Sequence, residues 1–289
     1  MVAKLNLPNN CSLDILREII VERREHRPLQ AFYDDIKPSL ELQFSEYVSK
    51  KGDPAFIKPL DLSQFTIDKI ESEKRKKTLI NLFKPKNHQL PYLILDMMRN
   101  DHGLLCCPSC GEDGSPGTLD HYLPKDIFPE LSICLANLTP MCNHCQKAKL
   151  TAYMTEEGDK AYFHPYFDEI NDSFFRVIIE EPFNAPSFKL QISNAPKDIE
   201  GLLELHSKGI NLKERFHKFC KTKHIHLMKL IAKKRRNKQL QSAKELIENY
   251  IEPELEKSLN SWPAIYYQSV LDAPAFLDYL DNGKLPDNI

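Results

Sequence analysis

The sequence predicts a predominantly helical α+β fold, and three observations support this. Apolar residues recur at helical spacing over residues 1–100 and again beyond residue 198. Four of the nine glycines fall within fifteen residues in between, which predicts tight turns. Two β-rich runs within residues 174–193 predict a hairpin. The expected order is a helical N-terminal region (1–100), a turn-rich central region (101–170), and a hairpin followed by a helical C-terminal region (171–289).

The composition is that of an ordinary globular chain. Apolar residues make up 42% of the 289 residues, which is enough for one large core or two modest ones. Charged residues make up 28%, and the net charge is −2. No stretch approaches the roughly 18 apolar residues of a membrane span, and the N-terminus lacks the features of a signal peptide. We therefore expect a cytoplasmic protein that does not interact with membranes.

The N-terminal region reads as a helical scaffold. Ser12 can cap a first helix with an inward face formed by Leu16, Ile19 and Ile20. The next helical segment is expected to break at Pro28 and Pro38, because proline lacks a backbone N–H. Residues 63–83 predict a further amphipathic helix. No catalytic pattern is visible in this region.

Two Cys-x-x-Cys pairs occur in the central region, Cys107 with Cys110 and Cys142 with Cys145. In a reducing compartment, doubled pairs of this kind indicate a metal site, and four thiolates favour a structural zinc ion. Cys106 could replace Cys107, but the Cys107 spacing is the more usual one. Coincidental buried or redox-active cysteines are the alternative. The other cysteines are expected to be ordinary apolar residues: Cys11, Cys134 and Cys220.

The residues between the cysteine pairs add a second pattern. Asp120-His121-x-x-Pro124 follows the first pair, and Asn137-Leu138 precedes the second. The ordered set, over roughly residues 103–150, resembles the zinc-stapled branch of the HNH endonuclease superfamily. This resemblance implies a central ββα-metal core flanked by helical regions and the hairpin. It also implies metal-dependent hydrolysis of phosphodiester bonds, in DNA rather than RNA.

The resemblance assigns roles to three residues. His121 would be the general base that activates water, and a neutral imidazole suits this role near pH 7. Asp120 would hold a hard divalent cation, Mg²⁺ or Mn²⁺, which is distinct from the zinc ion. Asn137 would tie the hairpin loop together and orient the histidine through backbone hydrogen bonds.

The third motif position departs from the family. Asn or His usually follows the second cysteine pair directly, and Gln146 stands there instead. Its amide oxygen can still bind the catalytic ion, although the extra methylene changes its reach. His164 is the second choice for this ligand, and His144 and Asn143 lie nearby in the sequence. Lys147 and Lys149 are expected to meet phosphate groups.

A basic stretch marks the C-terminal region. Residues 213–238 hold eleven Lys and Arg residues and one Glu, a local charge of +10. Phe216, Phe219, Leu227 and Leu230 are expected to face a core, with Lys218 and Lys221 in solvent. Such runs are often only solvated faces, but a nuclease must hold a polyanion. We therefore expect backbone contacts to nucleic acid from this helix: Lys229, Lys233, Lys234, Arg235 and Arg236.

The sequence thus favours an HNH-type endonuclease that acts on DNA. A compact core within a helical chain also resembles nuclease subunits of bacterial anti-phage systems such as Septu, whose partner is an ATPase. The alternative is a zinc-stabilised nucleic-acid-binding or scaffold subunit without cleavage, with Gln146 as the lesion. A thiol oxidoreductase fits poorly, because that class uses one Cys-x-x-Cys in a βαβ context.

Overall fold

The chain divides into two compact units in the computed structural model. The structure describes residues 4–9, 11–25, 27–170 and 172–285. We call Lys4–Leu104 together with Ser115–Glu169 the N-terminal unit, and Leu105–Gly114 together with residues 170–285 the C-terminal unit. The central region predicted from the sequence therefore falls mostly in the N-terminal unit, together with the helices that precede it. No helix among the described residues is long and apolar enough to cross a bilayer.

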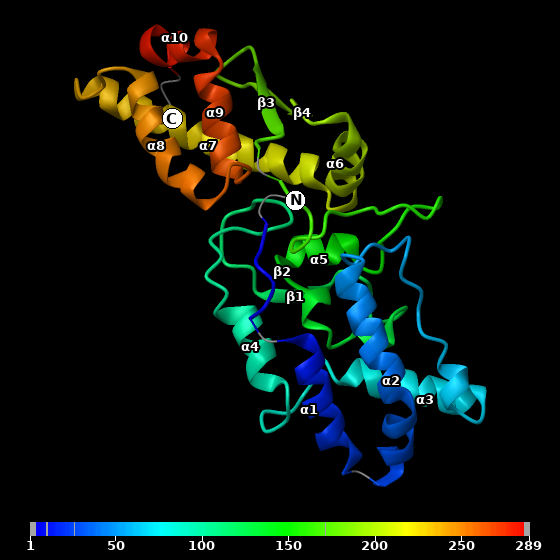
Figure 1. Cartoon of the computed structure of the whole chain (residues 1–289). Coiled ribbons are helices and arrows are strands. Elements are labelled where there is room, and N and C mark those ends of the chain that lie inside the picture. The colour runs from blue at the N-terminus through cyan, green and yellow to red at the C-terminus, as the bar shows by residue number, and fades with distance from the viewer. Residues whose placement is uncertain (1–3, 10, 26, 171, 286–289) are drawn as a thin grey trace. The chain divides into compact units, whose positions relative to one another are not determined.

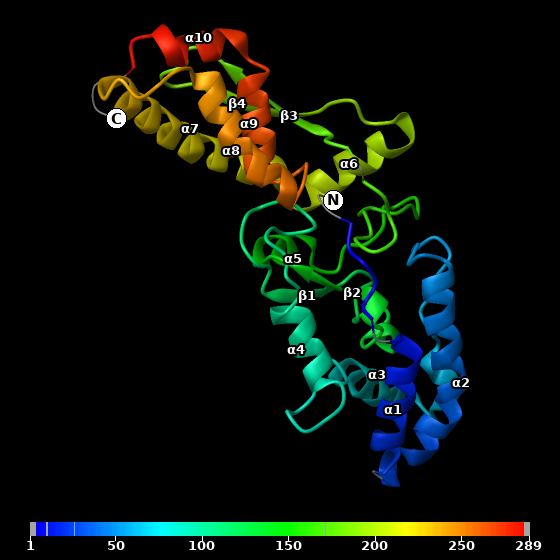
Figure 2. The same cartoon turned by 60° about the vertical axis from the view of Figure 1, so that its left-hand side comes forward.

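Helices are the main regular structure of the N-terminal unit (Figures 1 and 2). Two long helices, α1 and α2, lie side by side and contact each other along their length. Short helical turns, η1 to η3, connect the other elements. In chain order the helical elements are α1 (Ser12–Arg24), α2 (Arg27–Ser49), η1 (Leu62–Phe65), α3 (Lys69–Asn81), α4 (Tyr92–Asn100), η2 (Pro129–Leu131), η3 (Leu135–Asn137) and α5 (Asn143–Lys149).

Two details of α1 and α2 differ from the sequence prediction. Ser12 is the first helical residue, and Cys11 takes the cap position without a side-chain hydrogen bond. Pro38 lies inside α2 and does not end it. Tyr33, Ile36 and Leu40 are all at most 1% exposed on the core face of this helix. Their burial offsets the hydrogen bond that proline removes, whereas Pro38 itself is on the exposed side.

A small ββα arrangement lies within the N-terminal unit. Strands β1 (Thr118–His121) and β2 (Leu138–Met141) pair antiparallel, and His121 stands opposite Leu138. Helix α5 follows β2 directly and packs against β1 (Figures 1 and 2). This order of elements is the one that the resemblance implied. The structure itself establishes only an α+β fold with two small antiparallel sheets.

The second sheet is the hairpin of the C-terminal unit, which confirms the prediction for residues 174–193. Strand β3 (Phe175–Glu180) pairs antiparallel with β4 (Ser187–Ile192), so that Phe175 stands opposite Ile192. β3 packs against α9, and β4 packs against α7. The helices of this unit are α6 (Lys197–Gly209), α7 (Leu212–Arg236), α8 (Ala243–Lys257), α9 (Trp262–Leu271) and α10 (Pro274–Asn282).

Helix α7 spans the C-terminal unit and buries one face. Phe216 and Leu227 are buried as predicted, whereas Phe219 and Leu230 are only partly buried. The same face also carries polar groups. His224 is buried, and its Nε2 donates to the carbonyl oxygen of Phe183 at 2.8 Å. Aromatic rings from the sheet and from α9 and α10 complete this core, among them Phe188, Tyr266 and Phe276.

Candidate metal centre and active site

Four cysteines come together as the sequence predicts. The sulfur atoms of Cys107, Cys110, Cys142 and Cys145 all lie within 4.8 Å of one another. Three of these side chains are buried and Cys142 is partly buried. Cys142 also caps α5, because its sulfur accepts a hydrogen bond from the backbone N–H of Cys145 at 3.5 Å. Four sulfur ligands at this separation could hold a structural zinc ion.

The turn that carries Cys107 and Cys110 is held by neighbours within the C-terminal unit. Gly111 has a positive φ of 79°, and its N–H bonds to the Cys107 carbonyl at 2.8 Å. The chain's one tryptophan, Trp262, donates its indole N–H to the Cys110 carbonyl at 2.5 Å. The guanidinium of Arg215 lies 3.4 Å from the Cys110 sulfur. Such a positive group favours the thiolate form that a metal requires.

The cysteines outside the cluster behave in two ways. Cys106 is buried but is not part of the cluster, so the preference for Cys107 is confirmed. Burial raises the pKa of the Cys106 thiol to about 11, which keeps it protonated. Cys134 and Cys220 are buried as expected of apolar residues, whereas Cys11 is exposed, contrary to the prediction. Cys11 lies at the start of α1, where little of the chain covers it.

Asp120 and Lys149 form a buried ion pair at the end of β1. The Lys149 ammonium lies 2.9 Å from Asp120 Oδ2, and the side chains of Lys149 and Asp120 are 1% and 7% exposed. The same ammonium donates to the backbone carbonyl of His121 at 2.9 Å. Burial raises the pKa of Asp120, and the positive charge of Lys149 opposes that rise. The carboxylate therefore already has a cationic partner inside the protein.

His121 ends β1 with its imidazole turned into the protein. Its Nε2 lies 2.9 Å from the carbonyl oxygen of Ser132, and because a carbonyl only accepts, Nε2 carries the proton. Burial lowers the pKa of His121 to about 3, and the nearby charge of Lys125 acts in the same direction. The imidazole is therefore neutral, with its lone pair on Nδ1. Among the described residues no hydrogen bond to Nδ1 is found, and the ring packs edge-on against Phe83.

Asn137 fastens the loop that joins β1 to β2. Its side-chain oxygen accepts hydrogen bonds from the Leu123 N–H at 2.7 Å and from the Tyr47 hydroxyl at 3.0 Å. Its side-chain nitrogen donates to the carbonyls of Leu123 and Leu131, at 3.0 and 3.2 Å. The amide is fully buried, so these four bonds hold the loop between the paired strands.

His164 supports Tyr47 and is not available as a metal ligand. Its Nδ1 accepts from the Tyr166 N–H at 3.2 Å, and its Nε2 therefore donates to the Tyr47 hydroxyl at 2.8 Å. Both ring nitrogens are used, and the side chain is fully buried. These bonds therefore argue against His164, the second choice from the sequence as a ligand for the expected catalytic ion. His164 and Tyr47 form a buried chain that leads to Asn137.

Gln146 lies on α5, in reach of β1. Its side-chain nitrogen donates to the Leu119 carbonyl at 3.1 Å, next to Asp120. A carboxylate and an amide oxygen are the hard donors that Mg²⁺ and Mn²⁺ prefer, so the chemistry of the donors fits such an ion. Asp120 is already paired with Lys149, so a divalent ion would compete with the lysine ammonium for this carboxylate.

The two lysines of α5 have different environments. Lys147 is exposed, as the prediction of a phosphate contact requires. Lys149 is 2% exposed, and its ammonium is engaged with Asp120 and the His121 carbonyl. The prediction that Lys149 meets phosphate is therefore wrong for this structure. Lys149 does lie on a helix as predicted, but the sequence spacing could not show that its side chain faces β1.

Five of the six exposed cations of α7 form one stripe, and only Lys213, near its start, lies on another side of the helix. At about 100° per residue the five fall within about a third of the helix circumference, opposite the buried face. We call them the basic stripe: Lys218, Lys221, Lys229, Lys233 and Arg236. Lys218 also pairs with Glu214 at 3.4 Å, where both side chains are 75% exposed.

Arg235 does not belong to the basic stripe. Its guanidinium donates to the backbone carbonyls of Leu280 and Gly283, at 3.3 and 2.8 Å. This half-buried side chain therefore fastens the end of α7 to the segment around α10, whereas the sequence predicted that it stays in solvent. Charge alone could not distinguish it from Arg236.

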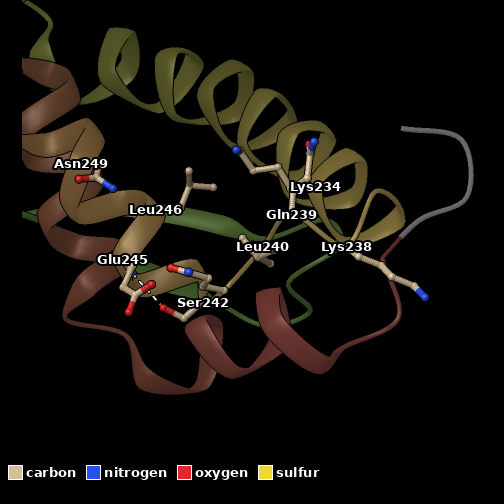
Figure 3. Close-up of a pocket in the computed structure, with 9 residues that line it drawn as sticks. Lys234, Lys238, Gln239, Leu240, Ser242, Glu245, Leu246 and Asn249 are labelled. Carbon is tan, nitrogen blue, oxygen red and sulfur yellow. Dashed lines mark hydrogen bonds between the residues drawn. The ribbon is translucent and has the colours of Figure 1, made fainter.

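Lys234 lines a hollow of about 350 Å³ where α7 meets α8 (Figure 3). Lys234 and Lys238 come from the α7 side, whereas Ser242, Glu245 and Asn249 come from the α8 side. Ser242 caps α8 by accepting a hydrogen bond from the Glu245 N–H at 3.1 Å. The hollow is polar and of mixed charge, and it continues the cationic end of α7.

Sequence reasoning missed several residues of the site. Ser132 fixes the proton of His121 through its carbonyl, which any residue could supply. Tyr47 reaches Asn137 across 90 positions in the sequence, so no local spacing could signal it. Phe83 covers the imidazole from the segment after α3. The motif had drawn attention to Lys149, but the sequence did not predict that it pairs with Asp120.

Comparisons with known proteins give one distant likeness. The chain is 31% identical over 119 residues to the protein Ea31 of Escherichia phage lambda. The match covers 41% of this chain and 38% of that protein, which is too little to establish a shared family. The name of that protein does not state an activity. No family model matches the chain, and no solved structure matches it.

Proposed function

We propose that the protein is a metal-dependent endonuclease that hydrolyses phosphodiester bonds in DNA. The observation that carries the proposal is the state of His121. Its Nε2 proton is committed to the Ser132 carbonyl, which leaves the Nδ1 lone pair of a neutral imidazole without a hydrogen bond from any described residue at the end of β1. The HNH-like order of Cys107, Asp120, Asn137 and Cys142 in the sequence supports the same assignment.

The proposed reaction uses His121 as a general base. Nδ1 takes a proton from water, the water oxygen bonds to phosphorus, and the phosphorus–oxygen bond to the leaving sugar breaks. The leaving oxygen then takes up a proton from solvent. Asn137 acts indirectly, because its four hydrogen bonds fix the loop that starts beyond His121. Positive charges from Lys125 and Arg99 near His121 would favour an approaching phosphate.

Asp120 and Gln146 would hold the divalent ion in this proposal. When bound, such an ion stabilises negative charge that develops on the phosphate and leaving oxygens. Asp120 supplies the carboxylate, and Gln146 presents its amide from α5 while its nitrogen is bonded to Leu119. The site is almost closed in this structure, since Asp120 and His121 are 5% and 6% exposed. Substrate access thus requires that Phe83 move away from the imidazole.

The basic stripe of α7 is the proposed surface for the DNA backbone. Five exposed cations on one face can replace counterions along a phosphate chain, without reading the base sequence. Exposed Lys147 would add a contact near the reaction site. Only the sequence resemblance suggests a partner subunit such as an ATPase. The same holds for a role in anti-phage defence.

A cleavage assay on supercoiled plasmid tests the proposal. The wild type is incubated with Mg²⁺ or Mn²⁺, beside His121→Ala and the control His88→Ala, whose side chain is exposed in the loop before α4. We expect relaxed or linear plasmid from the wild type and the control. His121→Ala should be slower by about 10²- to 10⁴-fold, the usual contribution of a general base. Equal zinc content in all three proteins excludes misfolding.

A non-catalytic scaffold is the second candidate, and two observations favour it. Gln146 replaces the usual Asn or His, and Lys149 already neutralises Asp120. Such a protein would retain plasmid in a gel-shift experiment but leave it intact with every metal. That outcome, also with candidate partners added, would replace the nuclease proposal by the scaffold.

A further inference from the structure

The ammonium of Lys149 lies beside the Asp120 carboxylate, where the proposed divalent ion would bind. Its ammonium is 2.9 Å from Asp120 Oδ2 and 2.9 Å from the His121 carbonyl. The aliphatic stem is sealed from solvent, and the ammonium lies 5.7 Å from the centre of the Tyr162 ring. A lysine buried to this extent is rare without a partner, so its position is specified by Asp120.

We infer that Lys149 is a built-in counter-cation of Asp120 that competes with divalent metal for the carboxylate. A metal ion at Asp120 and an ammonium at the same oxygen would repel each other strongly in a buried site. Binding of the metal therefore requires that Lys149 leave Asp120. The resting site is charge-balanced without metal, and it takes up Mg²⁺ or Mn²⁺ only at a cost in affinity. This inference rests on the proposed function for the identity of Asp120 as a ligand.

The charge of the Asp120 carboxylate can be balanced either by Lys149 or by a divalent ion. With Lys149 in place the pair carries no net charge, and the chain remains folded around it. With Lys149 removed by mutation, Asp120 is left buried without a cation, since Lys125 acts on it only through longer-range charge. A divalent ion is then the natural replacement, and it should bind more tightly and stabilise the fold more.

Calorimetric titration with Mn²⁺ tests the inference, with Lys149→Met beside the wild type. Met keeps most of the unbranched side chain but lacks the terminal ammonium and its charge. We expect the Mn²⁺ dissociation constant of Lys149→Met to be at least about tenfold lower than that of the wild type. Lys147→Met removes an exposed lysine from the same helix, and its affinity should match the wild type within about twofold. Unchanged or weaker Mn²⁺ binding by Lys149→Met would overturn the inference.

A second measurement needs no variant and covers the case in which Lys149→Met does not fold. Lysine acylation of the wild type is followed by mass spectrometry with and without saturating Mn²⁺. Buried Lys149 should react poorly without metal and severalfold more with it, whereas exposed Lys147 should react equally in both. Equal protection of Lys149 in both conditions would show that metal and ammonium do not compete.

The two proposals fail in different ways. If Mn²⁺ binds with the expected competition but plasmid remains intact, the nuclease proposal fails and the role of Lys149 stands. If plasmid is cut in a His121-dependent manner while Lys149→Met binds Mn²⁺ no better, the role of Lys149 fails and the nuclease stands. If neither protein binds Mn²⁺, Asp120 is not a ligand and the inference is wrong.

Discussion

Single side chains in the N-terminal unit show how burial decides chemistry. His121 is neutral because it is buried, and a backbone carbonyl determines which of its nitrogens keeps the lone pair. Asp120 stays paired because Lys149 is buried beside it. A third buried group, Glu130, has no cationic partner at all within the described residues. Its environment gives a prediction that is independent of catalysis.

Glu130 should make the stability of the protein depend on pH. Burial raises the pKa of its carboxyl from 4.5 to about 7, although Leu60 N–H and Gln43 donate to it. Because the folded state holds the proton more tightly, the stabilisation is complete below pH 4.5 and is lost as the pH rises through 7. The loss should amount to about 3 kcal/mol. Glu130→Gln should lack this part of the pH dependence.

Urea unfolding at pH 5 and pH 8 measures the effect. The wild type should lose more free energy of unfolding between the two pH values than Glu130→Gln, by about 3 kcal/mol or somewhat less. The exposed control Glu156→Gln should follow the wild type. Parallel pH profiles for the wild type and Glu130→Gln would mean that the carboxyl ionises as freely as in the unfolded chain.

Residue types and spacings predicted the cysteine cluster well, because a metal site demands a fixed chemistry. They also placed Asp120, His121 and Asn137 on one short unit. Burial of Lys149 and Arg235 was not predictable, since both are ordinary cations in sequence and their partners include backbone carbonyls. Backbone acceptors carry no residue-type signal, so such contacts appear only in three dimensions.

At the scale of elements, periodicity was a good guide to type and a poor one to boundaries. The hairpin of β3 and β4 and the helix α7 were predicted where they occur. Pro38 was expected to break a helix, but the apolar face of α2 on either side overrides it. The cap residue of α1 is Cys11 and not the expected Ser12, and Cys11 makes no side-chain capping hydrogen bond.

Helix α7 carries the prediction for nucleic-acid binding. Lys229, Lys233 and Arg236 belong to the basic stripe, so replacing all three by Gln should weaken DNA binding at low salt. Each lost phosphate contact should reduce the slope of log affinity against log salt by about 0.9, and the triple variant by about 2 to 3. Fluorescence anisotropy with a labelled duplex at several salt concentrations measures this slope.

Arg235→Gln is the matched control for the basic stripe. Its guanidinium is bonded to the Leu280 and Gly283 carbonyls, so its loss should lower the free energy of unfolding by about 1–3 kcal/mol. The salt slope for DNA should remain that of the wild type. If Arg235→Gln reduced the slope and the triple variant did not, the phosphate-binding face of α7 would be wrongly assigned.

The cysteine cluster matters at the scale of the whole molecule. Small elements such as the four-residue strands β1 and β2 bury little apolar area of their own. A structural zinc ion would contribute folding free energy directly. We therefore expect about one zinc ion per chain, and removal of it by a strong chelator should lower the melting temperature.

Cysteine variants sharpen the zinc prediction. Cys107→Ser removes a ligand and should reduce zinc content, measured by atomic emission on protein purified without chelators. Cys106→Ser changes a buried neighbour outside the cluster and should retain zinc at the wild-type level. Zinc loss from Cys106→Ser with retention in Cys107→Ser would contradict the cluster as it stands.

The rate of plasmid cleavage in the presence of Mn²⁺ tests the central claim most directly. His121 is the group on which the proposed chemistry depends, and no other described residue places a neutral imidazole at the end of β1. The wild type should cut, and zinc-loaded His121→Ala should cut about 10²- to 10⁴-fold more slowly. A wild type that leaves plasmid intact, or a His121→Ala variant that cuts as fast, would contradict it.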